Sequence, residues 1–160
     1  ALPISSAAGT LRIGIQEDPD SLDPAAGGFF VGRVVFAAMC DKLVDIDANL
    51  DFVPQLATSW SLAPDGKALT LKLRPDVVFH DGEKLDAEAV KINLDRYRTA
   101  PESRRRAETR PITAVEGVDP LTVTLRLDAP FAPLLSVLAD RAGMMLSPKA
   151  LAAQIGRAHV

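Results

Sequence analysis

The sequence predicts a domain of mixed α/β class. Residues 69–74 alternate leucines with polar side chains, which is the two-residue period of a half-buried strand. Residues 30–39 are mostly apolar, and four of them recur at the spacing of one helical face: Val31, Val34, Val35 and Ala38. Segments of both kinds follow one another in an irregular order, which favours an α/β or α+β fold.

The remaining elements of the first half follow from local patterns. Residues 11–15 alternate apolar and polar side chains and predict a strand, and the acidic, proline-interrupted residues 17–24 predict a loop. Residues 43–47 predict a short strand that ends in a turn at 47–49. Residues 64–67 read Pro-Asp-Gly-Lys, a turn in which proline presets φ and glycine supplies a positive φ.

The second half begins with a helix and a hairpin. Asp86 is the predicted N-cap of a helix whose buried face would comprise Ala87, Val90, Leu94 and Tyr97. The polar and basic residues 100–110 predict an exposed connection. Residues 112–118 and 121–127 predict two strands joined at Asp119-Pro120.

Three short elements complete the prediction. Residues 131–138 carry apolar side chains at helical spacing, and residues 144–146, Met-Met-Leu, predict a short apolar strand. Ser147 followed by Pro148 predicts the start of a last helix, with the serine as its cap and proline at its first position.

Composition excludes several classes of function. The 160 residues carry a net charge of −3 and a pI near 5.4, which argues against nucleic-acid binding. Cys40 is the single cysteine, so a disulfide framework and a cysteine zinc site are excluded, and two histidines are too few for a histidine-rich metal site. His80 beside Asp81 is interpreted as part of a turn, because no nucleophile motif accompanies it.

Both ends of the chain are interpreted as artificial. Residues 155–160 can be encoded by ATC GGA AGA GCA CAC GTC, and residues 1–4 by GCT CTT CCG ATC, which match the two ends of a common sequencing adapter. We therefore expect residues 1–5 and 154–160 to be adapter-derived and residues 6–153 to be the genuine domain.

Four stretches of the sequence form motifs. Residues 22–24 read Leu-Asp-Pro, and residues 54–60 read Pro-Gln-Leu-Ala-Thr-Ser-Trp. Residues 65–74 lead on to Phe-His-Asp-Gly at 79–82, and Ser-Pro stands at 147–148. In this order the motifs resemble one family, the family 5 bacterial extracellular solute-binding proteins of dipeptide, oligopeptide, glutathione and nickel ABC importers, whose pattern Pro-x-Leu-Ala-x-Ser-Trp matches residues 54–60.

The resemblance implies a fold and a function. The fold is periplasmic-binding-protein-like, of the two-lobed class II type, and this chain would hold the first part of lobe one with its accessory domain. The function is capture of short peptides or related solutes outside the cytoplasmic membrane, in the periplasm or anchored at the cell surface. Delivery to ABC permease subunits would follow, with no cofactor or metal, no nucleic acid, and a monomer at full length. An enzyme or regulatory domain that reuses the fold is the alternative, and nickel-chelate or glutathione binding is an alternative ligand subclass.

Two candidate ligand contacts lie in the acidic loop. Asp20 and Ser21 follow the carboxyl end of a predicted strand, where ligand clefts of α/β folds form. The alternative is a solvated acidic loop in which Asp23 caps the next segment.

Five further candidates lie beyond the loop. Phe29 and Phe30 could stack on a ligand or pack in the core, and Cys40 stands where the family usually has an aromatic side chain near the cleft. Arg141 could pair with a ligand carboxylate or form a surface ion pair with Asp140. The last candidate is Met144, which together with its neighbour Met145 could line an apolar subsite or fill the core.

Overall fold

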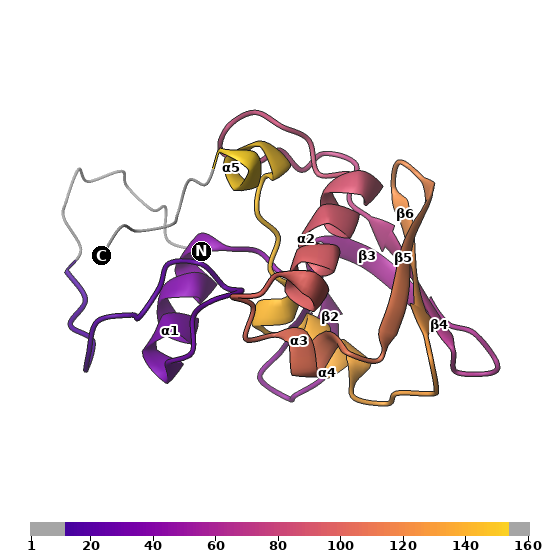
Figure 1. Cartoon of the computed structure of the whole chain (residues 1–160), viewed down its shortest axis with the longest axis horizontal. Helices are drawn as coiled ribbons and strands as arrows, with labels where there is room; N and C mark the ends of the chain where they lie inside the picture. The colour runs from indigo at the N-terminus through magenta and orange to yellow at the C-terminus, as the bar shows by residue number, and fades with distance from the viewer. Residues whose placement is uncertain (1–11, 154–160) are drawn as a thin grey trace, which may run out of the picture.

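The computed structural model describes residues 12–153, so the interpretation of residues 1–5 and 154–160 as adapter-derived lies outside it and stays a prediction. Its centre is a four-stranded antiparallel sheet in the order β3-β4-β6-β5 (Figure 1). The four strands are β3 (Ala57–Leu62), β4 (Ala68–Leu73), β5 (Ile112–Asp119) and β6 (Thr122–Leu127). Leu69 pairs with Leu125 and Leu71 with Val123, and all four side chains are buried. The predicted strand and hairpin are therefore confirmed.

One face of the sheet is covered by helix α2 (Ala87–Thr99). Its predicted N-cap is confirmed, because Oδ1 of Asp86 accepts a hydrogen bond of 2.8 Å from the backbone N–H of Ala89. Val90, Leu94 and Tyr97 point into the core and are fully buried, as their helical spacing predicts.

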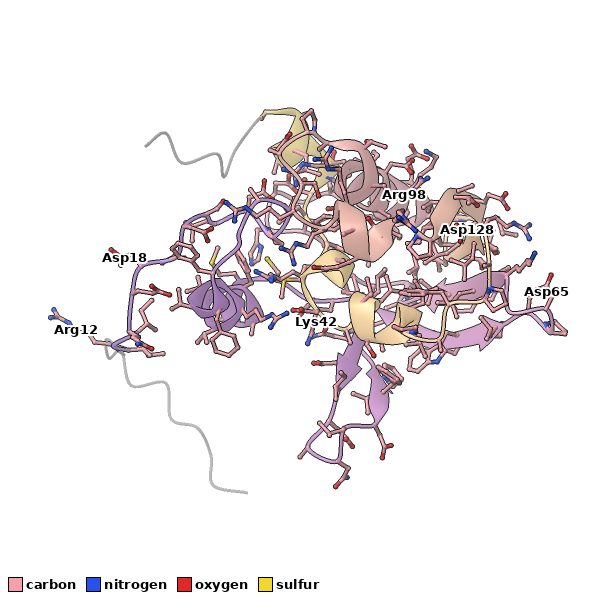
Figure 2. All side chains as sticks on the ribbon, turned by 60° about the horizontal axis from the view of Figure 1, so that its bottom comes forward. Arg12, Asp18, Lys42, Asp65, Arg98 and Asp128 are labelled. Carbon is pink, nitrogen blue, oxygen red and sulfur yellow. The ribbon has the colours of Figure 1, made fainter. Side chains whose placement is uncertain are left out.

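The two predicted Asp-Gly turns also form. Gly66 has φ of 70° between β3 and β4, and Gly82 has φ of 89° before α2. Both values lie in the left-handed region, which only glycine enters without steric cost. Asp65 lies at the tip of the first turn, at the far end of the sheet (Figure 2).

Shorter elements surround this core. The strands β1 (Val44–Ile46) and β2 (Phe52–Pro54) form a separate antiparallel pair. Further along the chain lie α3 (Arg106–Thr109), α4 (Leu134–Leu138), the 3-10 turn η1 (Arg141–Gly143) and α5 (Pro148–Ala152). Ser147 caps α5 by accepting a hydrogen bond from the N–H of Ala150, as predicted. Within residues 12–153, no helix has the length and apolar character that a membrane span requires.

Helix α1 (Phe30–Met39) lies to one side of the sheet (Figure 1). Its bounds match the prediction, but its buried face matches only in part: Val31 is buried as predicted, whereas Val34 is 51% exposed and Ala38 is exposed. Phe36, which lies outside the predicted stripe, is fully buried and packs against the loop that precedes the helix, where a Cβ on Gly27 would stand 2.9 Å from its ring. Contact with this loop therefore decides which side chains of the helix are buried.

Two predicted strands are wrong. Residues 12–15 form no strand, and Ile13 is 72% exposed, because none of the strands among the described residues pairs with this segment (Figure 2). Residues 144–146 contribute a single isolated bridge, between Met144 and Lys42. An alternating or apolar pattern shows which face a strand would bury, but the strand itself requires a hydrogen-bonding partner along its length.

The predicted exposed connection at residues 100–110 holds only in part. Most of the segment is exposed, but it contains α3, and Ser103, Arg105 and Thr109 are buried. The hydroxyl of Ser103 donates to the backbone carbonyl of Tyr97 over 2.7 Å, which folds the segment back onto the end of α2. Local polarity did not indicate this burial, because backbone carbonyls accept from all three polar side chains: nearby in the sequence for Ser103 and Thr109, and at Gly27 for Arg105.

Candidate functional site

Residues 20–29, called here the N-terminal loop, are held by their own side chains. The carboxylate of Asp20 accepts hydrogen bonds from the N–H of Gly28 at 2.9 Å and of Phe29 at 3.3 Å. Desolvation raises the pKa of Asp20, but these hydrogen bonds outweigh it and hold that pKa below its ordinary value. Ser21 Oγ accepts from the N–H of Asp23 at 3.0 Å. Asp20 and Ser21 therefore shape the loop, and a role in ligand contact stays a prediction.

Asp23 fastens this loop to α2. Its side chain is largely buried and accepts hydrogen bonds from the N–H of Ala25 at 2.9 Å and from Nη1 of Arg96 at 3.0 Å, with a second contact from Nη2 of the same arginine. The hydrogen bonds that the Arg96 guanidinium donates to the Asp23 carboxylate raise the pKa of Arg96. Asp23 thus closes a turn at Ala25 but does not cap α1, whose N-cap is Phe29, and its ion pair with Arg96 adds a long-range anchor.

Two buried arginines converge on the loop from the other side. Arg141 Nη1 donates to the carbonyl of Gly27 at 2.9 Å, and Arg105 Nη2 donates to the same oxygen at 3.3 Å. The two residues are only 6% and 4% exposed. The Nε atoms of both are buried without a hydrogen-bond partner among the described residues. The loop thus contacts two buried guanidinium groups, each of which has an N–H donor without a hydrogen-bond partner among the described residues.

The charges of these arginines are balanced unequally. Arg105 pairs with Glu108 at 2.7 Å, and Asp140 pairs with Arg33, so the alternative of an Arg141–Asp140 surface ion pair is wrong. Across residues 12–153, no salt bridge joins Arg141 to a carboxylate. Desolvation, followed by the neighbouring charges of Arg105 and Arg33, lowers the pKa of Arg141. Of the two buried arginines on the Gly27 carbonyl, Arg141 is therefore the one without an ion-pair partner within the described residues, and an anionic group beside it would be favoured.

The two phenylalanines stand at the end of this loop, where α1 begins. Phe29 is 48% exposed and Phe30 is 73% exposed, so neither fills the core in this structure. The guanidinium carbon of Arg33 lies 6.0 Å from the centroid of the Phe30 ring. Both rings are accessible for stacking, although a ligand contact stays a prediction.

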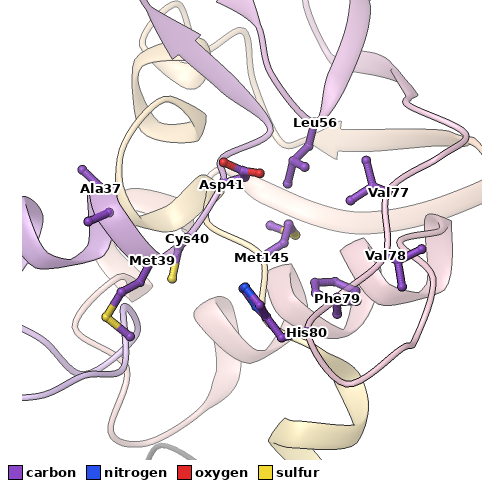
Figure 3. Close-up of a pocket in the computed structure, with 11 residues that line it drawn as sticks. Ala37, Met39, Cys40, Asp41, Leu56, Val77, Val78, Phe79, His80 and Met145 are labelled. Atoms are coloured by element: carbon purple, nitrogen blue, oxygen red, sulfur yellow. The ribbon is translucent and has the colours of Figure 1, made fainter. Parts of the chain in front are cut away.

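A second feature, called here the groove, lies between the end of α1 and the turn before α2. It consists of two adjoining hollows of about 280 and 400 Å³. The two hollows share five lining residues, which Figure 3 shows around one of them: Met39, Cys40, Phe79, His80 and Met145. Cys40 thus lies in the groove, beyond the N-terminal loop, and its contact with a ligand stays a prediction.

Met144 lines neither hollow. It is 3% exposed, and its carbonyl accepts a 2.7 Å hydrogen bond from the hydroxyl of the fully buried Tyr97. The alternative reading of Met144 as core filling therefore agrees with the structure, whereas its neighbour Met145 lines the groove. Burial, then the charges of Asp41 and Asp23, raises the pKa of the Cys40 thiol to about 11.

Five of the seven candidate residues lie around one segment in the structure, although their contact with a ligand stays a prediction. Asp20, Ser21, Phe29 and Phe30 belong to the N-terminal loop or the start of α1, and Arg141 contacts that loop. Sequence reasoning missed Arg105, which it placed in a solvated linker between acidic neighbours. Residues 12–153 contain no group of three or more His, Cys, Asp or Glu side chains that could hold a metal ion.

Comparison with known proteins gives a consistent result. The family model described as bacterial extracellular solute-binding proteins, family 5 middle, matches residues 51–155. Glutathione-binding protein GsiB of Pectobacterium atrosepticum is 37% identical over 133 residues, which are 82% of this chain and 26% of that protein. GsiB of Escherichia coli K12 is 32% identical over 146 residues, or 91% of this chain and 28% of that protein.

Solved structures agree with the sequence matches. The PBP AgaA from A. tumefacien R10 in complex with agropinic acid superposes with a TM-score of 0.80 at 30% identity, over 88% of this chain and 29% of its own. NikZ of Campylobacter jejuni in complex with Ni(L-His) gives 0.75 at 27% identity, over 91% of this chain and 29% of its own. This chain spans between a quarter and a third of the length of these relatives. With a family model that matches most of its length, the chain belongs to the bacterial extracellular solute-binding proteins of family 5.

Proposed function

We propose that this chain is part of the substrate-binding component of an ABC importer, which captures short peptides or related solutes outside the cytoplasmic membrane. The captured solute would be handed to the permease subunits by closure of two lobes around it. Family membership supports the class of function, since proteins that bind glutathione, agropinic acid and Ni(L-His) are among the relatives.

The observation that carries the ligand assignment is Arg141. Its guanidinium is buried at the base of the N-terminal loop, and it uses one Nη donor on the carbonyl of Gly27. A buried cation without a paired carboxylate is electrostatically costly, and an incoming carboxylate would relieve that cost. Arginine also offers two parallel donors that match the two oxygens of a carboxylate. We therefore propose that the ligand carries at least one carboxylate, as peptides and glutathione do.

The test is a calorimetric titration of the full-length protein that contains this chain. Short peptides with a free carboxyl terminus, their carboxyl-terminal amides, glutathione and Ni(L-His) serve as probes, with the wild type and Arg141→Met compared. A hydrogen bond to a charged group contributes about 1.5–3 kcal/mol, so we expect Arg141→Met to weaken carboxylate binding by roughly 10- to 100-fold. Arg126→Met, which removes an exposed arginine paired with Glu116, is the matched control and should bind as the wild type does.

The amide probes separate loss of a contact from loss of structure. In the wild type, replacing the ligand carboxylate by an amide should weaken binding, whereas in Arg141→Met the same replacement should have little further effect. If the acid and the amide differ equally in both proteins, Arg141 does not bind the carboxylate. If none of the probes binds the wild type, the proposed peptide class is wrong.

A further inference from the structure

The groove gathers most of the soft metal ligands that the chain possesses. The sequence contains one cysteine, three methionines and two histidines. Two of the methionines, the cysteine and one histidine line both hollows: Met39, Met145, Cys40 and His80. The second histidine, His159, lies outside the described residues. In a chain so poor in these residue types, their convergence from three distant segments is the feature to explain.

The side chains are placed to share one ligand. Figure 3 shows the imidazole of His80 pointing toward the sulfur of Cys40, with Met145 lining the same space. Met145 is 5% exposed and held in place, whereas Met39 is 50% exposed at the rim, where its flexible side chain can swing inward. No hydrogen bond formed among residues 12–153 uses the Cys40 sulfur or the His80 ring, so their donor atoms stay available.

Among the described residues, only two carboxylates, Asp41 and Asp81, line the groove, and each accepts a hydrogen bond from the protein. Asp41 Oδ1 accepts a hydrogen bond from Gln55 Nε2 at 3.2 Å. The carboxylate of Asp81 accepts from the N–H of Glu83 at 3.1 Å and from the hydroxyl of Ser147. Hard cations such as Mg²⁺ and Ca²⁺ require several free oxygen ligands, so the groove does not suit them. The groove's available donors are thiol, thioether and imidazole.

We propose that the groove binds one soft monovalent metal ion, Cu(I) or its redox-inert analogue Ag(I), through Cys40, His80 and Met145, with Met39 as an additional thioether. Thiolate and thioether sulfur select Cu(I), and imidazole is also a good ligand for copper. Zinc is less suitable, because structural zinc sites are built from thiolate, imidazole and carboxylate rather than thioether. On binding, the Cys40 thiol loses its proton to solvent and the sulfur lone pair forms the bond to the metal, so the oxidation state of the metal does not change.

The experiment is an anaerobic competition between the full-length protein and a chromophoric Cu(I) chelator, repeated with Ag(I). The variants are Cys40→Ser, Met145→Leu and the matched control Met144→Leu, whose side chain lines neither hollow. Changes to groups around a metal's own ligands cost about 10- to 100-fold in affinity, so loss of the Cys40 ligand should cost at least roughly 100-fold. Met145→Leu should cost about tenfold, and Met144→Leu should leave the affinity unchanged.

Two results would overturn the proposal. One is Cys40→Ser retaining wild-type affinity and stoichiometry, which would place any bound metal elsewhere in the protein. The other is Met144→Leu losing as much affinity as Met145→Leu, which would indicate a general effect on the fold. Thermal unfolding of each variant shows whether it is folded, and Met145→Leu conserves volume and preserves packing. The competition uses no organic solute, so its outcome is independent of the proposed transport function.

Discussion

The ion pair between Asp23 and Arg96 should control the attachment of the N-terminal loop, and Asp23→Asn tests this directly. The two side chains are 10% and 16% exposed, and the contact is bidentate. Removing one partner of a buried pair costs about 3–5 kcal/mol when the other charge is left uncompensated, but Arg96 keeps a second partner, Glu102, at 3.8 Å. Asparagine keeps the shape and one acceptor for the N–H of Ala25, and water reaches the edge of the pair. We therefore expect a loss of about 2–3 kcal/mol.

The assay is amide hydrogen exchange of Gly27, whose N–H donates to the carbonyl of Asp23 at 2.8 Å. A loss of 2–3 kcal/mol in local stability should speed that exchange by roughly 30- to 150-fold, since each 1.36 kcal/mol is a factor of ten. Glu116→Gln is the control, because its pair with Arg126 is 47% and 52% exposed and should contribute at most about 1 kcal/mol. An exchange rate for Gly27 that changes less than threefold, or equally in the two variants, would refute the reasoning.

Two further predictions concern titrating groups. Burial raises the pKa of Tyr97, so above pH 10 the unfolded chain loses a proton that the folded chain keeps. Tyr97 should therefore contribute a fall in stability of up to about 1.4 kcal/mol per pH unit there, and Tyr97→Phe should remove this contribution while costing about 1–2 kcal/mol at neutral pH. Tyrosinate absorbance of this single tyrosine checks it, and ionisation of the folded protein near pH 10 would contradict it. The Cys40 thiol, with a pKa of about 11, should react with iodoacetamide at a rate that rises about tenfold per pH unit from pH 7 to 10. A plateau near pH 8.5 would show an ordinary thiol.

Elements that carry their own start and stop signals were predictable from sequence. The β3–β4 turn follows from proline and glycine at 64–66, and α2 follows from Asp86 and its apolar spacing. In each case the interaction that stabilises the element is local in the sequence, such as the positive φ of Gly66 or the Asp86 cap. The strand predicted at residues 11–15 lacks such support, because its formation depends on a partner strand that no local pattern specifies.

The candidate site shows the same division. The N-terminal loop was identified from its acidic, proline-interrupted composition, but the environment of Arg141 was not. The contact of Arg141 with Gly27 joins residues 114 positions apart in the sequence. The contact of Arg105 with the same carbonyl joins residues 78 positions apart. Neither contact has a periodicity or a motif. Charged side chains are usually exposed, so the most useful signal, a buried arginine, was the one that composition argued against.

These contacts link the N-terminal loop to three elements. Asp23 pairs with Arg96 of α2, and the carbonyl of Gly27 accepts from Arg105 at the start of α3 and from Arg141 of η1. Arg33 of α1 pairs with Asp140, the residue before Arg141. A carboxylate that drew Arg141 away from Gly27 would release one of the two hydrogen bonds on that carbonyl and leave the other to Arg105. The loop would then keep its anchor on α2 through Asp23. Binding at Arg141 should therefore loosen Gly27 locally without detaching the loop, whereas Asp23→Asn should detach it even in the absence of ligand. Hydrogen exchange of the Gly27 amide, measured with and without ligand in the wild type and in Asp23→Asn, tests this. It distinguishes a local change in the loop on ligand binding from a loss of the loop's attachment to α2.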